Sequence, residues 1–270
     1  MRYLVYDVFT DRPFGGNPLA IFPDASSLAP ALMQPIAREF GFSETIFLFP
    51  EDGDVRVRIF TPTQEIPFAG HPLIGSLVAL HDEGAPDTVT IHTGVGPIAG
   101  CVADGVASFR REAEVELLHT PDPALVARCL SIDPAAIAEV TIASAGLPFA
   151  LTELSDRETL SRTRPDLGAF REASALYPLP FDFSVYAYVR EGETIHARMF
   201  APLDDIPEDP ATGSAATVLA LYLAKGGSLN LEIRQGEDMA RPSLIRAEAA
   251  GGAVIISGRA VRVMEGRLTV

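Results

Sequence analysis

The pattern of hydrophobic and polar positions predicts short strands along most of the chain. Residues 55–59 alternate between valine or isoleucine and arginine, which is typical of a strand with one solvent-exposed face. Residues 45–49 are continuously apolar, β-branched or aromatic, which predicts a more buried strand. Further strands are predicted at residues 1–9, 89–93, 98–102, 106–110, 140–143, 149–153, 183–189, 194–200, 229–234 and 253–257.

Helical segments are fewer. Residues 30–40, which end at Gly41, and residues 124–130 are predicted to be helical. The segments 73–80 and 215–224 are apolar on nearly all faces of a helix. Because a helix that is apolar all round has to be buried, we expect these two helices to be enclosed by the strands.

The second half of the chain repeats landmarks of the first half in the same order. Each copy has Phe-x-Pro, then Ile-Pro, then His-Pro or Asp-Pro, then Gly-Ser and an apolar helix. The copies occupy residues 60–80 and 200–216, and we interpret them as a duplication. Pro72 and Pro210 are expected at the first helical position of each copy, where a missing N–H costs nothing.

The repeat predicts two similar halves with a cleft between them. A proline-rich segment at residues 118–123 resembles a crossover. We therefore expect an N-terminal half of residues 1–117, joined by a last strand at about 260–270, and a C-terminal half of residues 118–259. If both helices begin at the cleft, their free N–H groups form a site for a small carboxylate, to which Ser76 and Ser214 add hydroxyl groups.

Two titratable residues precede the prolines of the repeat. By position alone, Asp209 fits a helix N-cap, and His71 fits a structural histidine that binds a nearby carbonyl. Their equivalent places in the two copies favour another interpretation, in which one donates and the other accepts a proton. Both interpretations stay open at this level.

Composition and charge exclude several classes of function. The formal net charge is −15, which disfavours a nucleic-acid partner. The apolar runs are shorter than the roughly 20 residues that a membrane span requires. Cys101 and Cys129 show no disulfide or CxxC spacing, so we expect a cytoplasmic protein. The acidic residues at 204–209 are interrupted by prolines and joined by no histidine, so no metal site is predicted.

Four motifs then resemble the PhzF-like family of phenazine biosynthesis. They are F-G-G-N-P-L-A at residues 14–20, F-S-E-T-I-F at 42–47, P-F-A-G-H-P at 67–72 and E-D-P-A-T-G-S-A-A at 208–216. The resemblance implies an α+β, diaminopimelate-epimerase-like fold with two pseudo-symmetric halves. Each half is a strongly curved mixed sheet around a central helix.

The resemblance also implies a cofactor-independent isomerase and a homodimer. The family's best-known member shifts a proton on trans-2,3-dihydro-3-hydroxyanthranilate. Carried over by motif, the catalytic residues are Glu44, His71 and Asp209. The substrate-binding residues expected from the motifs and the helix starts are Gly70, Gly213, Ser214, Ser76 and Asn17.

Two alternatives to this isomerase stay open. One is an amino-acid racemase with another substrate, although neither Cys101 nor Cys129 lies at a helix start as in the two-thiol epimerases of this fold. The other is a protein that binds a small carboxylate without converting it. One departure from the family is Ala240, which replaces the usual glycine in a Q-G-x-x-M-G-R-P-S-like stretch that is expected to lie outside the catalytic motifs.

Overall fold

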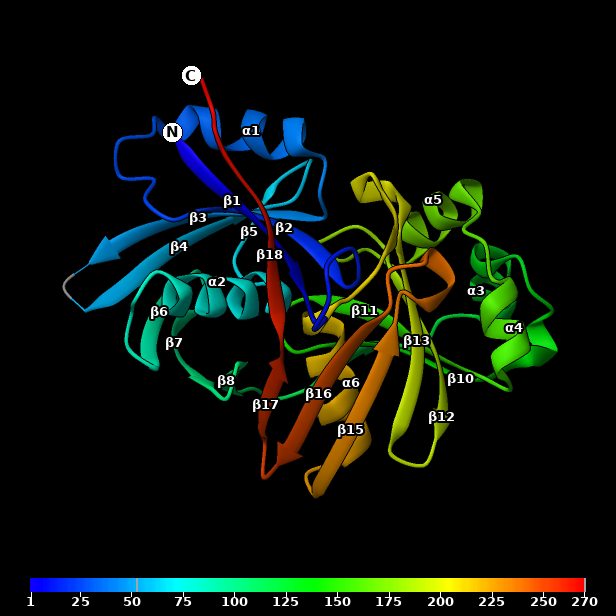
Figure 1. The fold of residues 1–270 in the computed structure, drawn as a ribbon. Coiled ribbons are helices and arrows are strands. Elements are labelled where there is room, and N and C mark those ends of the chain that lie inside the picture. Colours follow the sequence, from blue (N-terminus) through cyan, green and yellow to red (C-terminus); the bar gives the residue numbers. More distant parts are fainter. Residues whose placement is uncertain (52, 270) are drawn as a thin grey trace.

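A computed structural model describes residues 1–51 and 53–269 (Figure 1). Its strands are β1 (Arg2–Val8), β2 (Asn17–Phe22), β3 (Glu44–Glu51), β4 (Asp54–Phe60), β5 (Glu65–Ile66), β6 (Thr88–Thr93), β7 (Gly96–Ala103), β8 (Val106–Glu112), β9 (Glu116–His119), β10 (Ile137–Ser144), β11 (Pro148–Leu154), β12 (Val185–Glu191), β13 (Thr194–Ala201), β14 (Ile206–Asp209), β15 (Ser228–Gln235), β16 (Ser243–Ala250), β17 (Ala253–Gly258) and β18 (Ala260–Arg267). Its helices are α1 (Met33–Phe40), α2 (Gly70–Asp82), α3 (Pro123–Leu130), α4 (Arg157–Arg162), α5 (Leu167–Leu176) and α6 (Gly213–Ala224), with short 3-10 turns at Pro30–Leu32, Pro134–Ala136, Pro202–Asp204 and Glu237–Met239.

The strands form one mixed sheet that encloses two helices. Figure 1 shows the blue and cyan strands around α2 on one side, and the green to orange strands around α6 on the other. The two parts are joined where β17 pairs with β8, and β18 returns to pair with β1. The predicted boundary between residues 117 and 118 falls inside β9 and stays a prediction.

The burial of α2 and α6 follows from their composition. All residues from Gly70 to Ala79 of α2 and from Gly213 to Leu221 of α6 are buried. Leu73 and Leu219 are fully inaccessible, and each buried side chain of this size contributes about 1.5–3 kcal/mol. The prediction of an enclosed apolar helix in each copy of the repeat is therefore confirmed.

The strands and helices that surround α2 and α6 were only partly predicted. In β4 the alternating pattern has the expected effect, because Val55, Val57 and Ile59 are buried beside exposed Arg56. Helices α4 and α5, by contrast, and strands β2 and β16 were not predicted. The two helices carry a sequence signal, since Asp156 and Asp166 accept hydrogen bonds from the first-turn N–H groups of each helix at 2.7 Å.

The expected starts of the two central helices are wrong. Helix α2 begins at Gly70 and α6 at Gly213, so neither Pro72 nor Pro210 occupies the first position. Asp209 belongs instead to β14, where its backbone pairs with β13. The positions that correspond at the helix starts are consequently His71 and Ser214, the second residue of each helix, rather than His71 and Asp209.

Candidate active site

A cavity of about 70 Å³ lies between the two halves. It receives side chains from β3 and the Thr61–Gln64 turn on one side and from β11, β13, β14 and the start of α6 on the other. Its lining consists of Ser43, Glu44, Thr61, Gln64, Ile66, Leu147, Pro148, Phe149, Phe181, Asp182, Ser184, Met199, Ala201, Asp204, Ile206, Asp209, Thr212 and Ser214.

Glu44 is the first residue of β3 and lines this cavity. Burial and, to a smaller extent, the negative charge of Asp209 raise the pKa of its carboxyl group to about 8, although the nearby Ser43 hydroxyl acts to lower it. Its Oε2 atom is inaccessible and has no hydrogen-bond partner among the described residues. A carboxyl group with such a pKa can give and take a proton close to neutral pH.

His71 lies beside Glu44. Its Nδ1 atom is 3.2 Å from Oε2 of Glu44, although the two atoms are not aligned as a hydrogen bond. Burial lowers the pKa of His71 to about 3, so the imidazole is neutral at pH 7. A neutral imidazole carries one N–H donor and one acceptor nitrogen, so it can interact with the neighbouring carboxyl group without adding a positive charge beside it.

Asp209 is buried at the end of β14. Asn17 donates a hydrogen bond to its Oδ1 at 2.8 Å, and the Thr212 hydroxyl donates to its Oδ2 at 2.5 Å. Burial raises the pKa of Asp209 to about 6, and these hydrogen bonds limit the rise. The carboxyl group is thus held in one orientation at the cavity wall.

Asn17 connects the two halves behind the cavity. Besides Asp209, its amide donates to the carbonyl of Ala211 at 2.9 Å and accepts from the Ser43 hydroxyl at 3.0 Å. Asn17 is fully buried, and its hydrogen bonds engage protein atoms. The structure therefore places it behind Glu44 and Asp209, not on the cavity wall where the predicted contact with substrate would require it.

The predicted glycines meet at the helix starts. A Cβ atom added to Gly70 would lie 2.8 Å from the Cα atom of Gly213, so neither position has room for a side chain. Ser214 follows Gly213 and lines the cavity. The first-turn N–H groups of the two helices therefore lie close together, which favours binding of a carboxylate.

Ser76 is not brought to this place. Because α2 begins at Gly70, Ser76 lies in the second turn of the helix, is fully buried and does not line the cavity. Its hydroxyl has no hydrogen-bond partner among the described residues. The expected role in binding substrate thus depended on a helix start that the structure does not have.

The Gln235–Ser243 segment contains supporting residues that sequence reasoning missed. Gln235, fully buried, donates to the Asp209 carbonyl at 2.7 Å and to the Thr212 hydroxyl at 2.9 Å. Arg241 donates to the carbonyls of Gly15 and Gly16, just before Asn17. The stretch lies outside the catalytic motifs, as expected, but it supports two of the loops that carry them.

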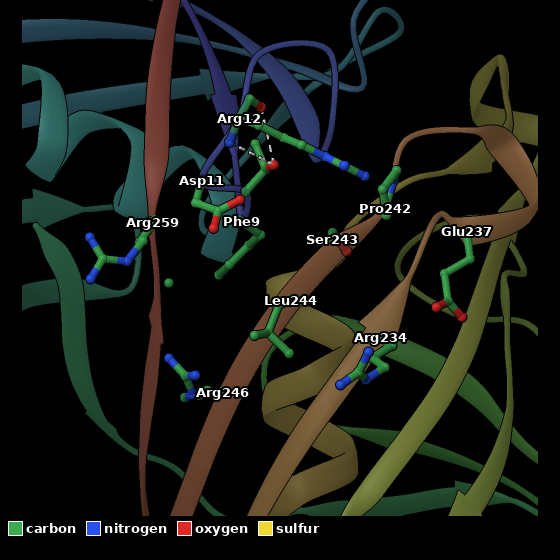
Figure 2. Close-up of a pocket in the computed structure, with 12 residues that line it drawn as sticks. Phe9, Asp11, Arg12, Arg234, Glu237, Pro242, Ser243, Leu244, Arg246 and Arg259 are labelled. Carbon is green, nitrogen blue, oxygen red and sulfur yellow. Dashed lines mark hydrogen bonds between the residues drawn. The ribbon is translucent and has the colours of Figure 1, made fainter.

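A larger hollow of about 290 Å³ lies next to this segment. Figure 2 shows Arg12, Arg234, Arg246 and Arg259 spread around its edge, not directed at one point. None of the predicted catalytic residues lines it. The smaller cavity is therefore the candidate active site.

Residues 1–51 and 53–269 contain neither a cluster of metal ligands nor a membrane-spanning helix. No group of three or more His, Cys, Asp or Glu side chains there could hold a metal ion. No helix of that part of the chain has the length and apolarity to cross a membrane.

Comparison with known proteins relates the chain to a family. Residues 6–266 match the family model for phenazine biosynthesis-like proteins. The chain is 36% identical to a trans-2,3-dihydro-3-hydroxyanthranilate isomerase of Pseudomonas aeruginosa, with 98% of each chain covered. Its structure is similar to that of a predicted epimerase from Pseudomonas aeruginosa, with a TM-score of 0.85, 31% identity and coverage of 100% of this chain and 99% of the other.

A more distant similarity concerns the fold alone. A hydroxyproline epimerase from Agrobacterium vitis, 13% identical, superposes with a TM-score of 0.65 over 98% of this chain and 91% of the other. The α+β, diaminopimelate-epimerase-like architecture expected from the motifs is thereby confirmed. From these findings, the chain belongs to the PhzF family of phenazine biosynthesis-like proteins and is an isomerase.

Proposed function

We propose that this isomerase moves a proton between two carbon atoms of a small ring-shaped carboxylate, similar to trans-2,3-dihydro-3-hydroxyanthranilate, without a cofactor. The observation that carries the proposal is Glu44, a carboxyl group with a pKa of about 8 that lines the cavity between the halves. At neutral pH both its protonated and its ionised form are populated. A group of that kind can remove a proton from carbon and return it.

The neighbouring residues have distinct parts in this mechanism. The substrate carboxylate binds at the N–H groups of the α2 and α6 starts and at the Ser214 hydroxyl, which orients the ring. Glu44 in its ionised form removes a proton from one ring carbon and then delivers it to another carbon on the same face. His71, neutral and with Nδ1 3.2 Å from Oε2 of Glu44, orients the Glu44 carboxyl group without taking up its proton. Asp209, held by Asn17 and Thr212, keeps the Glu44 pKa raised through its negative charge.

Proton exchange with solvent tests the proposal. The protein is incubated in D₂O with trans-2,3-dihydro-3-hydroxyanthranilate, and NMR follows the incorporation of deuterium and the shift of the double bond. We expect Glu44→Gln to lower the rate about 10²–10⁴-fold, the usual contribution of a positioned acid–base group. Glu116→Gln, which changes an exposed glutamate of β9, serves as the matched control.

Full activity in Glu44→Gln would remove Glu44 from the mechanism. Chiral chromatography of the products separates a 1,3-shift from racemisation of an amino acid. Binding of the acid with no exchange in the wild-type protein would favour a carboxylate-binding protein instead. The expected homodimer and cytoplasmic location stay predictions.

A further inference from the structure

A buried carboxylate joins two loops of the protein, the β1–β2 loop (residues 9–16) and the β15–β16 loop (residues 236–242). Asp7 belongs to β1 and is 2% exposed. Its Oδ1 atom lies 2.5 Å from Nη2 of Arg241, and its Oδ2 atom accepts a hydrogen bond from the backbone N–H of Phe14 at 2.6 Å. One oxygen of this charged group thus binds each loop.

The contact with Phe14 stabilises a strained turn of the β1–β2 loop. Phe14 has a left-handed backbone with φ of 68°, which is unfavourable for residues other than glycine. The residue is 72% exposed, so packing of its side chain compensates little of this cost. The hydrogen bond that its N–H donates to Asp7 therefore contributes to holding the turn.

Arg241 binds the end of the same loop. Its guanidinium group donates to the carbonyls of Gly15 and Gly16, each at 2.8 Å. The N–H of Gly16 in turn donates to the carbonyl of Pro242 at 3.0 Å. The ion pair between Asp7 and Arg241 therefore fixes a set of contacts between the backbones of the two loops.

Two glycines show that the loops are packed without free space. A Cβ atom added to Gly16 would lie 2.1 Å from the carbonyl oxygen of Val8. One added to Gly236 would lie 2.7 Å from the carbonyl oxygen of Pro210, the residue that follows Asp209. These neighbours are backbone atoms, which cannot rotate away as the end of a flexible side chain can. A shift of either loop is therefore passed on to the segment packed against it.

Each loop leads to a side chain that binds Asp209. Asn17, directly after the β1–β2 loop, donates to its Oδ1 atom at 2.8 Å. Gln235, directly before the β15–β16 loop, donates to its backbone carbonyl at 2.7 Å and to the hydroxyl of Thr212 at 2.9 Å. The Thr212 hydroxyl donates to the other carboxyl oxygen of Asp209. The position of Asp209 at the cavity therefore depends on both loops.

We propose that Asp7 is a positioning residue of this isomerase, which fixes the Asp209 carboxyl group by holding the β1–β2 and β15–β16 loops together. Asp7 does not line the cavity, so it acts through Asn17 and Gln235 and not on the substrate. The proposal rests on the proposed function, because it takes Asp209 as part of the active site. A displacement of about 1 Å in an active site can lower the rate about 100-fold.

A double-mutant cycle distinguishes positioning from a loss of stability. kcat and KM for trans-2,3-dihydro-3-hydroxyanthranilate are measured in D₂O for the wild type, Asp7→Asn, Asn17→Ala and the double variant. Asparagine keeps the shape of the side chain, but its amide nitrogen cannot accept a hydrogen bond. Asp7→Asn therefore loses the contact with either Phe14 or Arg241.

We expect Asp7→Asn to lower kcat about 10–100-fold and to change KM less than about threefold. In the Asn17→Ala background the same substitution should lower kcat less than about threefold, because one connection from the loops to Asp209 is already absent. Glu83→Gln, the matched control, removes a salt bridge to Arg2 of the same strand β1 and should leave kcat unchanged. Equal factors in both backgrounds, or an unchanged kcat in Asp7→Asn, overturn the proposal.

Arg241→Lys tests the same ion pair from its other side if Asp7→Asn does not fold. Lysine keeps the positive charge beside Asp7, but it lacks the planar group that donates to the carbonyls of Gly15 and Gly16 together. We expect this variant to lower kcat about tenfold with little change of KM. An unchanged kcat in Arg241→Lys also overturns the proposal.

Amide hydrogen exchange separates this proposal from the proposed function, because it requires no turnover. In Asp7→Asn, the N–H groups of Gly16 and Thr212, which bind Pro242 and Gln235, should exchange faster than in the wild type. Faster exchange at both, in a protein whose wild type incorporates no deuterium into substrate, would refute the isomerase mechanism and leave positioning by Asp7 supported. Deuterium incorporation by the wild type, with unchanged amide exchange in Asp7→Asn, would refute positioning by Asp7 and leave the isomerase mechanism supported.

Discussion

Glu44 is expected to destabilise the folded protein at high pH. In the unfolded chain its carboxyl group ionises near the ordinary pKa of 4.5, whereas burial raises the folded-state pKa to about 8. Between these values the folded state binds more protons than the unfolded state. The free energy of unfolding therefore falls as the pH rises through this window, and it is highest below pH 4.5 as far as this group is concerned.

The size of the effect follows from the shift. A rise of the pKa from 4.5 to about 8 corresponds to about 5 kcal/mol, at 1.36 kcal/mol per pH unit. Glu44→Gln keeps the shape of the side chain but cannot ionise. The variant therefore lacks the decrease in the free energy of unfolding that ionisation of Glu44 causes as the pH rises. Relative to the wild type, the variant is expected to gain several kcal/mol between pH 5 and pH 9.

Urea unfolding of the wild type, Glu44→Gln and Glu116→Gln at pH 5, 7 and 9 measures this gain. The pH dependence of the other groups cancels in the difference between wild type and variant. Glu116 is exposed in β9, so Glu116→Gln should show the same difference at all three pH values. A constant difference for Glu44→Gln as well would refute the buried, proton-holding carboxyl group on which the mechanism depends.

Three further variants test the supporting structure. Gly70→Ala places a Cβ atom 2.8 Å from the Cα of Gly213, so it should separate the helix starts, abolish most activity and lower stability by about 1–3 kcal/mol in urea unfolding. Ala240→Gly should raise stability by up to about 1 kcal/mol, because Ala240 has a left-handed backbone with φ of 57°, and a lower midpoint would contradict this. Gln235→Leu removes the donor to the Asp209 carbonyl; we expect kcat and its pH profile to change more than KM, whereas an unchanged pH profile would show that Gln235 only stabilises the fold.

Local patterns were sufficient for most strands and for the two central helices. The alternation in β4 predicts a strand with one buried face, and the all-apolar segments of α2 and α6 predict enclosed helices, since an apolar face has to be buried. Strand β16 and helix α5 were missed although their sequences carry a pattern. In β16, Ile245, Ala247 and Ala249 alternate with charged residues, and in α5 the buried residues Ala169, Phe170 and Ala173 share one helix face. Helix α4 has only six residues, too few for a period to show. What local patterns do not give is the pairing of strands that are distant in sequence, such as β17 with β8 and β18 with β1.

The proposed duplication and the candidate acid–base residues could be read from the amino-acid order, since motifs are a property of the chain itself. The tertiary structure decided what these residues can do. It placed Glu44 3.2 Å from His71, brought Gly70 against Gly213, and assigned Gln235 to the Asp209 loop. The physical reason is that pKa values, close backbone contacts and hydrogen bonds between distant segments depend on burial and distance, which arise only when the two halves pack together.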